Sequence, residues 1–222
     1  MKSYNKRNLL LVVLAISLGF GCSKKSEMQS RVDSLPYYSE ASFTPHWFNK
    51  ESDSLAAFHS IPSFSLTSQE GTTITEADLD NKIYVANFFF TTCPGICPRM
   101  TDNLKIVQEE FLDDDNVLLL SHSVTPDIDS VSVLKAYAQK RKIVSDRWLL
   151  LTGDRDQIYN LGRQSYFVEE DLGEEKSNDD FLHTENFILV DKNKHIRGIY
   201  NGLNKTSVQQ LIADIKTLEK ES

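Results

Sequence analysis

Short apolar runs separated by amphipathic stretches fill the chain from about residue 64 to the C-terminus. The run Ile83–Phe90 is almost entirely apolar, which is typical of a strand covered on both faces. Two further runs, Val117–Val124 and Trp148–Thr152, have the length of buried strands. This alternation predicts a layered α/β domain.

The intervals between these runs have helical periodicity. Met100, Leu104 and Val107 recur every three or four positions after the first buried strand, and Pro98 suits the first turn of a helix there. Further helices are predicted over Val131–Lys142, over Asp154–Gln164 and over a C-terminal stretch that carries Val208, Leu211, Ile212, Ile215 and Leu218.

Hairpins flank this core on both sides. Phe64–Leu66 and Thr72–Thr75 predict an N-terminal hairpin, and Asn186–Val190 and Ile196–Tyr200 predict a C-terminal one. The order of elements resembles a thioredoxin-like fold with an N-terminal hairpin extension and a C-terminal β-hairpin plus helix. Functional sites of such α/β sheets lie at the carboxyl ends of the parallel strands, so we expect the chemistry to follow Phe90.

The N-terminal residues have the pattern of an export signal. Lys2, Lys6 and Arg7 precede the apolar run Leu9–Phe20, and small residues lead into Cys22. The run is shorter than the roughly 20 residues that a membrane span needs. The ending resembles a bacterial lipoprotein signal, in which Cys22 is lipidated; an uncleaved signal anchor is the alternative.

We therefore predict a signal peptide over residues 1–21, a tether and N-terminal extension over 22–58, and a globular domain over 59–222. The part of the extension over Leu35–Phe58 is expected either to pack loosely or to wrap the edge of the domain. The domain would work outside the cytoplasm, on the periplasmic side of a bacterial membrane to which the lipid anchors it. A cysteine pair can be oxidised in that compartment. The formal net charge of −8 argues against non-specific nucleic-acid binding.

Two cysteines stand where the first buried strand passes into a helix. Cys93 and Cys97 lie in the segment C-P-G-I-C-P. Backbone N–H groups and the helix dipole at such a junction stabilise a thiolate. The loop can hold a metal ion between the sulfurs or close into a disulfide. A purely structural disulfide is disfavoured, because so small a loop removes little entropy from the unfolded chain.

His183 is the candidate for a third ligand. It lies just before the predicted strand Asn186–Val190, on a loop that faces the cysteine loop in a thioredoxin-type arrangement. Two thiolates and one imidazole suit a single copper ion, Cu(I) or Cu(II), bound by Cys93, Cys97 and His183.

The other four histidines are weaker candidates. His46 and His59 lie in or beside the N-terminal segment. His122 is expected to be a hydrogen-bonded side chain at a strand end, and it is the first alternative ligand. His195 follows a turn between charged residues and is expected to be solvated.

Residues 88–100, F-F-F-T-T-C-P-G-I-C-P-R-M, resemble the signature of the Sco (SenC) copper proteins. The segment His183–Asp191 is similar to the histidine segment of that family, and the likeness covers about residues 60–217. Two positions depart from the family pattern. Thr125 stands where an aspartate is frequent, although Asp129 keeps the second acid of that stretch, and Gly95 stands where an acidic residue is frequent.

The resemblance implies a thioredoxin-like fold that binds one copper ion through Cys93, Cys97 and His183. It also implies a role in assembling the dinuclear copper centre of cytochrome c oxidase. The main hypothesis is therefore a metallochaperone, a protein that binds and transfers copper, and an additional thiol–disulfide oxidoreductase activity stays open. The recipient would be the copper-centre subunit. A copper donor protein or a thiol reductant would be a further partner.

An extracytoplasmic thiol–disulfide reductase, acting on cysteines of the oxidase or of other exported proteins, is the alternative. Thioredoxin-type oxidoreductases resemble one another in a cis-proline before the strand that faces their cysteines. All six prolines of this chain lie between positions 36 and 126, so none can fill that place. This difference favours copper binding as the main role.

The segment Glu169–Phe181 carries seven acidic residues and one lysine. Such a run is typical of a solvated loop. A second hypothesis is that it steers a basic partner or copper toward His183.

Overall fold

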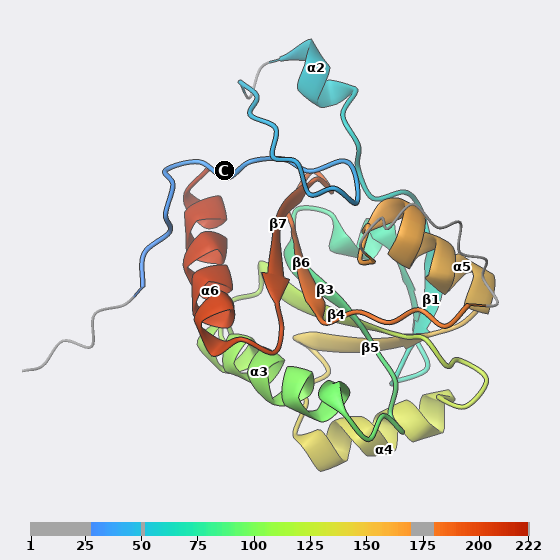
Figure 1. The fold of residues 1–222 in the computed structure, drawn as a ribbon. Coiled ribbons are helices and arrows are strands. Elements are labelled where there is room, and N and C mark those ends of the chain that lie inside the picture. The colour runs from blue at the N-terminus through green and yellow to red at the C-terminus, as the bar shows by residue number, and fades with distance from the viewer. Residues whose placement is uncertain (1–27, 50–51, 170–179, 222) are drawn as a thin grey trace, which may run out of the picture.

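The computed structural model describes residues 28–49, 52–169 and 180–221 (Figure 1). In this part of the chain, seven strands form one sheet in the order β2-β1-β5-β4-β3-β6-β7. Strands β3, β4 and β5 are parallel, and the other pairings are antiparallel. The strands are β1 (Ser65–Ser68), β2 (Thr73–Thr75), β3 (Ile83–Phe89), β4 (Val117–Ser123), β5 (Trp148–Thr152), β6 (Asn186–Val190) and β7 (Ile196–Asn201).

Helices cover both faces of the sheet (Figure 1). One face packs against α3 (Ile96–Glu110), α4 (Val131–Arg141) and α6 (Lys205–Lys220), and the other against α5 (Arg155–Asn160). Successive residues of β3 therefore enter opposite cores, with Phe89 in the first and Phe88 in the second. The predicted thioredoxin-like order, with hairpins on both sides and a C-terminal helix, is confirmed.

The helix predicted over Asp154–Gln164 is an α-helix only in its first part. The chain forms a π-helix over Leu161–Ser165 instead of continuing the single α-helix predicted over Asp154–Gln164. A Cβ added to Gly162 would lie 2.5 Å from Leu182, so only glycine fits there. The close contact places the backbone of this turn directly against the segment that leads into β6.

The N-terminal segment wraps the β7 edge of the sheet, which is the second of the two arrangements considered from the sequence. The N–H of Tyr38 donates to the carbonyl oxygen of Ile196 at 3.0 Å, and Leu35 and Tyr37 are buried. A short helix, α2 (Asp53–Ala56), was not predicted. The segment is thus packed on the domain over much of its described length.

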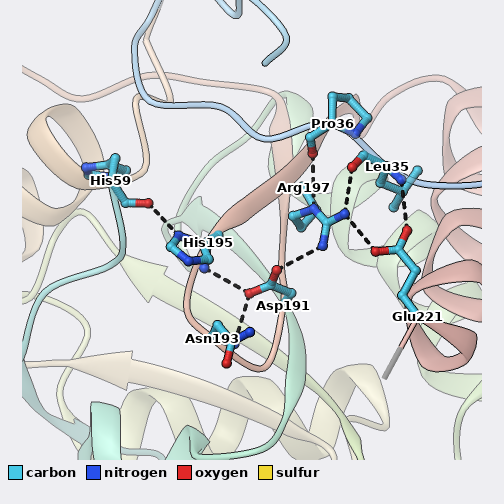
Figure 2. Close-up of polar contacts among 8 residues, drawn as sticks. All are labelled: Leu35, Pro36, His59, Asp191, Asn193, His195, Arg197 and Glu221. Atoms are coloured by element: carbon cyan, nitrogen blue, oxygen red, sulfur yellow. Dashed lines mark hydrogen bonds and ion pairs between the residues drawn. The ribbon is translucent and has the colours of Figure 1, made fainter. Parts of the chain in front are cut away.

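A buried arginine joins four segments near the turn of the β6–β7 hairpin (Figure 2). Arg197 is 4% exposed and forms ion pairs with Asp191 at 3.0 Å and with Glu221 at 2.8 Å. It also donates to the carbonyl oxygens of Leu35 and Pro36. Removing one partner of such a buried pair costs roughly 3–5 kcal/mol, because the remaining charge loses its compensation.

His195 lies under the N-terminal segment and is buried, so the prediction of a solvated side chain was wrong. Its Nδ1 lies 2.8 Å from the carbonyl oxygen of His59, and its backbone N–H donates to Asp191 (Figure 2). The ring of Tyr37 packs edge-on at 5.6 Å. Local sequence could not reveal this burial, because the covering residues come from more than 130 positions earlier.

His122 is fully buried on the face of the sheet opposite Cys97. Its ring stacks on Phe88 at 4.9 Å and lies 5.5 Å from Tyr166. Neither ring nitrogen is in ordinary hydrogen-bond geometry with a partner among the described residues, and the backbone of Asn87 offers only a weaker contact, so the predicted hydrogen-bonded side chain is wrong. Burial lowers the pKa of His122 to about 4.

His122→Phe should make the free energy of unfolding less sensitive to acid. The pKa of His122 is about 4 in the folded protein, against 6.5 in the unfolded chain, so folded-state stability is lost as pH falls from 6.5 to 4. One pKa unit corresponds to about 1.4 kcal/mol, so the loss reaches roughly 3 kcal/mol. At neutral pH the variant should be more stable by about 1–3 kcal/mol, because it buries no unpaired imidazole.

Urea unfolding between neutral pH and pH 4 measures both effects. His183→Ala, which removes an exposed histidine, is the control for loss of one imidazole and should keep wild-type stability at neutral pH. An acid-induced loss of stability that is equal in His122→Phe and wild type would contradict this account.

Candidate metal centre

The two cysteines lie at the carboxyl end of the central strand β3. The strand ends at Phe89 and α3 begins at Ile96, so Cys93 lies in the loop between them and Cys97 in the first helical turn. Both thiols are free. This is the place that the sequence pattern indicated.

The two thiols differ in exposure and in acidity. Cys93 is partly exposed, whereas Cys97 is 5% exposed and belongs to the core on the α3 side of the sheet. Burial raises the pKa of Cys93, but hydrogen bonds from the Cys97 backbone N–H and thiol, and from the N–H groups of Gly95 and Ile96, outweigh it and lower the pKa. Burial raises the pKa of Cys97 to about 12. Cys93 is therefore the more acidic and more accessible of the two thiols, and Cys97 is the buried one that holds its proton more strongly.

A buried carboxylate fixes the cysteine loop to the neighbouring strand. Asp129 is fully buried and accepts hydrogen bonds from the hydroxyl groups of Thr91, Ser123 and Thr125 at 2.5, 2.6 and 3.1 Å. The backbone N–H of Thr91 also donates to it, at 3.2 Å. Thr91 lies two residues before Cys93, so the network sets where the loop begins.

Sequence reasoning did not assign this role to Asp129. The signal that could have revealed it is the set of hydroxyl side chains at the ends of two adjacent parallel strands. Thr125, which departs from the family pattern, supplies one of these hydroxyl groups and so contributes to the network without a carboxylate of its own.

The loop that carries His183 lies beside the cysteine loop. Strand β6 pairs antiparallel with β3, with Ile188 opposite Ala86, so the start of β6 is near the end of β3. The ring of Phe181 packs edge-on against Phe90 at 5.3 Å. The side chain of His183 is exposed at this edge.

The other four histidines are engaged elsewhere. His46 packs in an aromatic cluster of the N-terminal segment, and Nε2 of His59 lies 2.8 Å from the carbonyl oxygen of Ser165. His195 is covered by the N-terminal segment. His122 lies on the opposite face of the sheet from Cys97, which removes it as the alternative ligand.

Within residues 28–49, 52–169 and 180–221, no three side chains of the His, Cys, Asp and Glu types are arranged to hold a metal ion together. The two thiols lie four residues apart at the junction of β3 and α3, and each shifts the pKa of the other. The imidazole of His183 is not gathered with them. The structure thus pairs two of the predicted donors and places the third on the adjacent loop.

Two predicted features fall outside the described residues: Cys22 with the export signal, and residues 170–179 of the acidic segment. Glu169, at the start of that segment, is described and is not solvated, because it forms a buried ion pair with Arg163. No helix in the described residues combines the length and apolar character that crossing a bilayer requires.

The sequence and the fold are similar to those of known proteins. The SCO1/SenC family model matches residues 52–220. A SCO1/SenC family lipoprotein from Bacillus anthracis str. Ames is 31% identical, with a TM-score of 0.64 over 72% of this chain and 95% of that one. BsSco, a member of the Sco family of cytochrome c oxidase assembly proteins with an identified disulfide switch, is 26% identical, with a TM-score of 0.62 over 74% and 95%. ScoI from Bradyrhizobium japonicum, with copper bound, is 25% identical, with a TM-score of 0.56 over 71% and 98%.

The family match runs from just before α2 to the end of α6 and includes both the cysteine loop and the His183 loop. It covers more than half of the chain. This protein therefore belongs to the SCO1/SenC family.

Proposed function

We propose that this protein binds one copper ion through the sulfur atoms of Cys93 and Cys97 and the imidazole of His183. It would pass the ion to the copper-centre subunit of cytochrome c oxidase during assembly of the dinuclear copper centre. One observation carries the proposal: two free thiols lie four residues apart where β3 passes into α3, beside an exposed histidine on the adjacent loop.

The donor set suits copper better than its competitors. Thiolate sulfur and imidazole nitrogen favour Cu(I) and also accept Cu(II). A structural zinc site normally has four protein ligands, and the proposed set has three. Cys93 is the more acidic thiol and Cys97 must lose its proton, so copper binding is coupled to proton release.

The arrangement also suits transfer of the ion. Cys93 and His183 are accessible at the surface, so the ligands of a recipient can approach from solvent. The imidazole is not gathered with the sulfurs, so copper binding requires a change in the His183 rotamer or in its loop. An imidazole that moves onto the ion can also move away from it, so a ligand of the recipient can replace His183 before it replaces the two sulfur atoms.

The similarities support this proposal. The copper-bound ScoI and the assembly-factor description of BsSco agree with a copper role in oxidase assembly. The lipoprotein from B. anthracis agrees with lipidation of Cys22 and an extracytoplasmic domain anchored to the membrane. A copper donor protein and a thiol reductant would complete the cycle, because a disulfide removes both thiolate ligands.

A thiol–disulfide reductase for the oxidase or other exported proteins is a second candidate. The contrast between a partly exposed Cys93 of lowered pKa and a buried Cys97 favours it. In such a reaction the Cys93 thiolate attacks a substrate disulfide, and Cys97 then displaces the second substrate thiol to form an internal disulfide. This chemistry does not use His183. Replacing His183 therefore distinguishes the two functions, because it should weaken copper binding and leave disulfide reduction unchanged.

Replacing either cysteine of the pair by serine should abolish tight copper binding, because serine removes the soft sulfur donor. In a Cys22→Ser background we expect one copper ion per reduced protein. Cys93→Ser and Cys97→Ser should each lower the affinity by more than about 100-fold, beyond what loss of an outer contact costs. Competition with a Cu(I) chelator measures this, and stoichiometric tight binding by the double variant would refute the thiolate ligands.

His183→Ala should weaken copper binding by about 10-fold or more while leaving the fold intact, because an exposed loop side chain adds little to the core. Metal ligands must be deprotonated, so wild-type affinity should also fall at lower pH, where protons compete with copper for the donor set. His122→Phe is the control and should keep wild-type affinity. The ligand role of His183 fails if His183→Ala and wild type bind copper equally well.

Iodoacetamide should modify Cys93 well before Cys97. The Cys93 thiolate is favoured by backbone N–H groups and is partly exposed, whereas Cys97 is buried and its pKa is raised to about 12. The rate at Cys93 should reach half of its maximum at a lower pH than the rate at an unperturbed cysteine. Peptide mass spectrometry after timed labelling gives both rates, and faster modification of Cys97 would contradict the assignment.

A further inference from the structure

A buried ion pair lies next to the segment that carries His183. Nε of Arg163 lies 2.7 Å from Oε2 of Glu169, and the two side chains are only 8% and 9% exposed. Arg163 comes from the π-helix Leu161–Ser165, whose wider turn packs on the segment before β6. Neither charge belongs to the proposed copper ligands.

Both members of this pair also bind the backbone of the histidine segment. Nη2 of Arg163 donates to the carbonyl oxygen of Asp180 at 2.8 Å. The second carboxylate oxygen of Glu169 accepts the backbone N–H of His183 at 3.2 Å. The ion pair therefore holds the chain on the N-terminal side of His183 and at His183 itself.

Apolar contacts fix the two residues in between. Phe181 packs edge-on against Phe90, which lies three residues before Cys93. Leu182 is 1% exposed and packs closely on Gly162. Every residue from 180 to 183 thus has a specific contact, although the His183 side chain is exposed.

This combination needs an explanation, because a buried ion pair adds little net stability once desolvation is included. Its attested value is in selecting one arrangement over others. Here the ion pair selects one backbone conformation for the segment that carries the exposed His183 side chain beside the cysteine loop. A fixed backbone leaves less conformational freedom to lose when a ligand closes on an ion.

We propose that Arg163 and Glu169 are positioning residues for copper binding, which hold His183 beside Cys93 and Cys97 without contacting the ion. This inference rests on the proposed function. It predicts that Glu169 affects copper affinity only through His183.

The chain offers a closely matched control near the β6–β7 turn, at the opposite end of the strands. Glu221 has the same pattern of contacts: one carboxylate oxygen pairs with Arg197 at 2.8 Å, and the other accepts the N–H of Leu35 at 2.8 Å (Figure 2). Its side chain is 11% exposed, close to the value for Glu169. Glu221→Ala should therefore reproduce any general loss of stability without touching the His183 segment.

The test is a double-mutant cycle in the full-length protein, with Cu(I) affinity measured by chelator competition and stability by urea unfolding. Glu169→Ala should lower affinity about 10-fold in the wild-type background and leave it unchanged in His183→Ala. Glu169→Gln, which keeps an oxygen that can accept the His183 N–H, should recover part of the loss and also serves if Glu169→Ala fails to fold. Glu221→Ala should lower stability and keep wild-type affinity.

Three outcomes would overturn the positioning role while leaving the proposed function standing. They are an unchanged affinity in Glu169→Ala, an equal loss in the His183→Ala background, and an equal loss of affinity in Glu221→Ala. An unchanged affinity in His183→Ala itself would instead contradict the histidine ligand, and the positioning role would fall with it.

Discussion

The antiparallel pairing of β6 with β3 is the constraint on which the candidate site depends. The cysteine loop follows β3 and the His183 loop precedes β6, so antiparallel pairing brings the two loops to the same end of these strands. A parallel pairing would place the two loops at opposite ends of the strands. The turn of the β6–β7 hairpin lies at the opposite end of the strands, where Arg197 holds the N-terminal segment. The pairing of β6 with β3 thus separates the end that carries the candidate site from the end that anchors the N-terminal segment.

Buried charged side chains fix the irregular backbone at both ends of the strands. Asp129 holds the start of the cysteine loop, the Arg163–Glu169 pair meets the histidine segment, and Arg197 binds the N-terminal segment. These loops lack the regular hydrogen bonds of strands and helices, so side chains supply the missing partners. The side chains proposed to bind copper can then be exposed to solvent while the backbone that carries them is held in place.

Elements with a clear local period could be predicted from the sequence. The strands, the two hairpins and the junction that carries the thiols followed from apolar runs and helical spacing, and the order of elements put the histidine loop at the right edge. Contacts between distant segments could not be predicted. His195 was expected in solvent and His122 with a hydrogen-bond partner, because the side chains around them come from remote positions. Asp129 and Glu169 were missed for the same reason, since their partners lie on other elements.

X-ray absorption spectroscopy of the reduced, copper-loaded protein can decide whether the two thiols and His183 bind copper, because it counts the sulfur and nitrogen atoms bound to the metal. We expect a copper ion bound by two sulfur atoms and one imidazole nitrogen, with loss of the imidazole signal in His183→Ala. A coordination sphere without sulfur, or an imidazole signal that persists in His183→Ala, would contradict it.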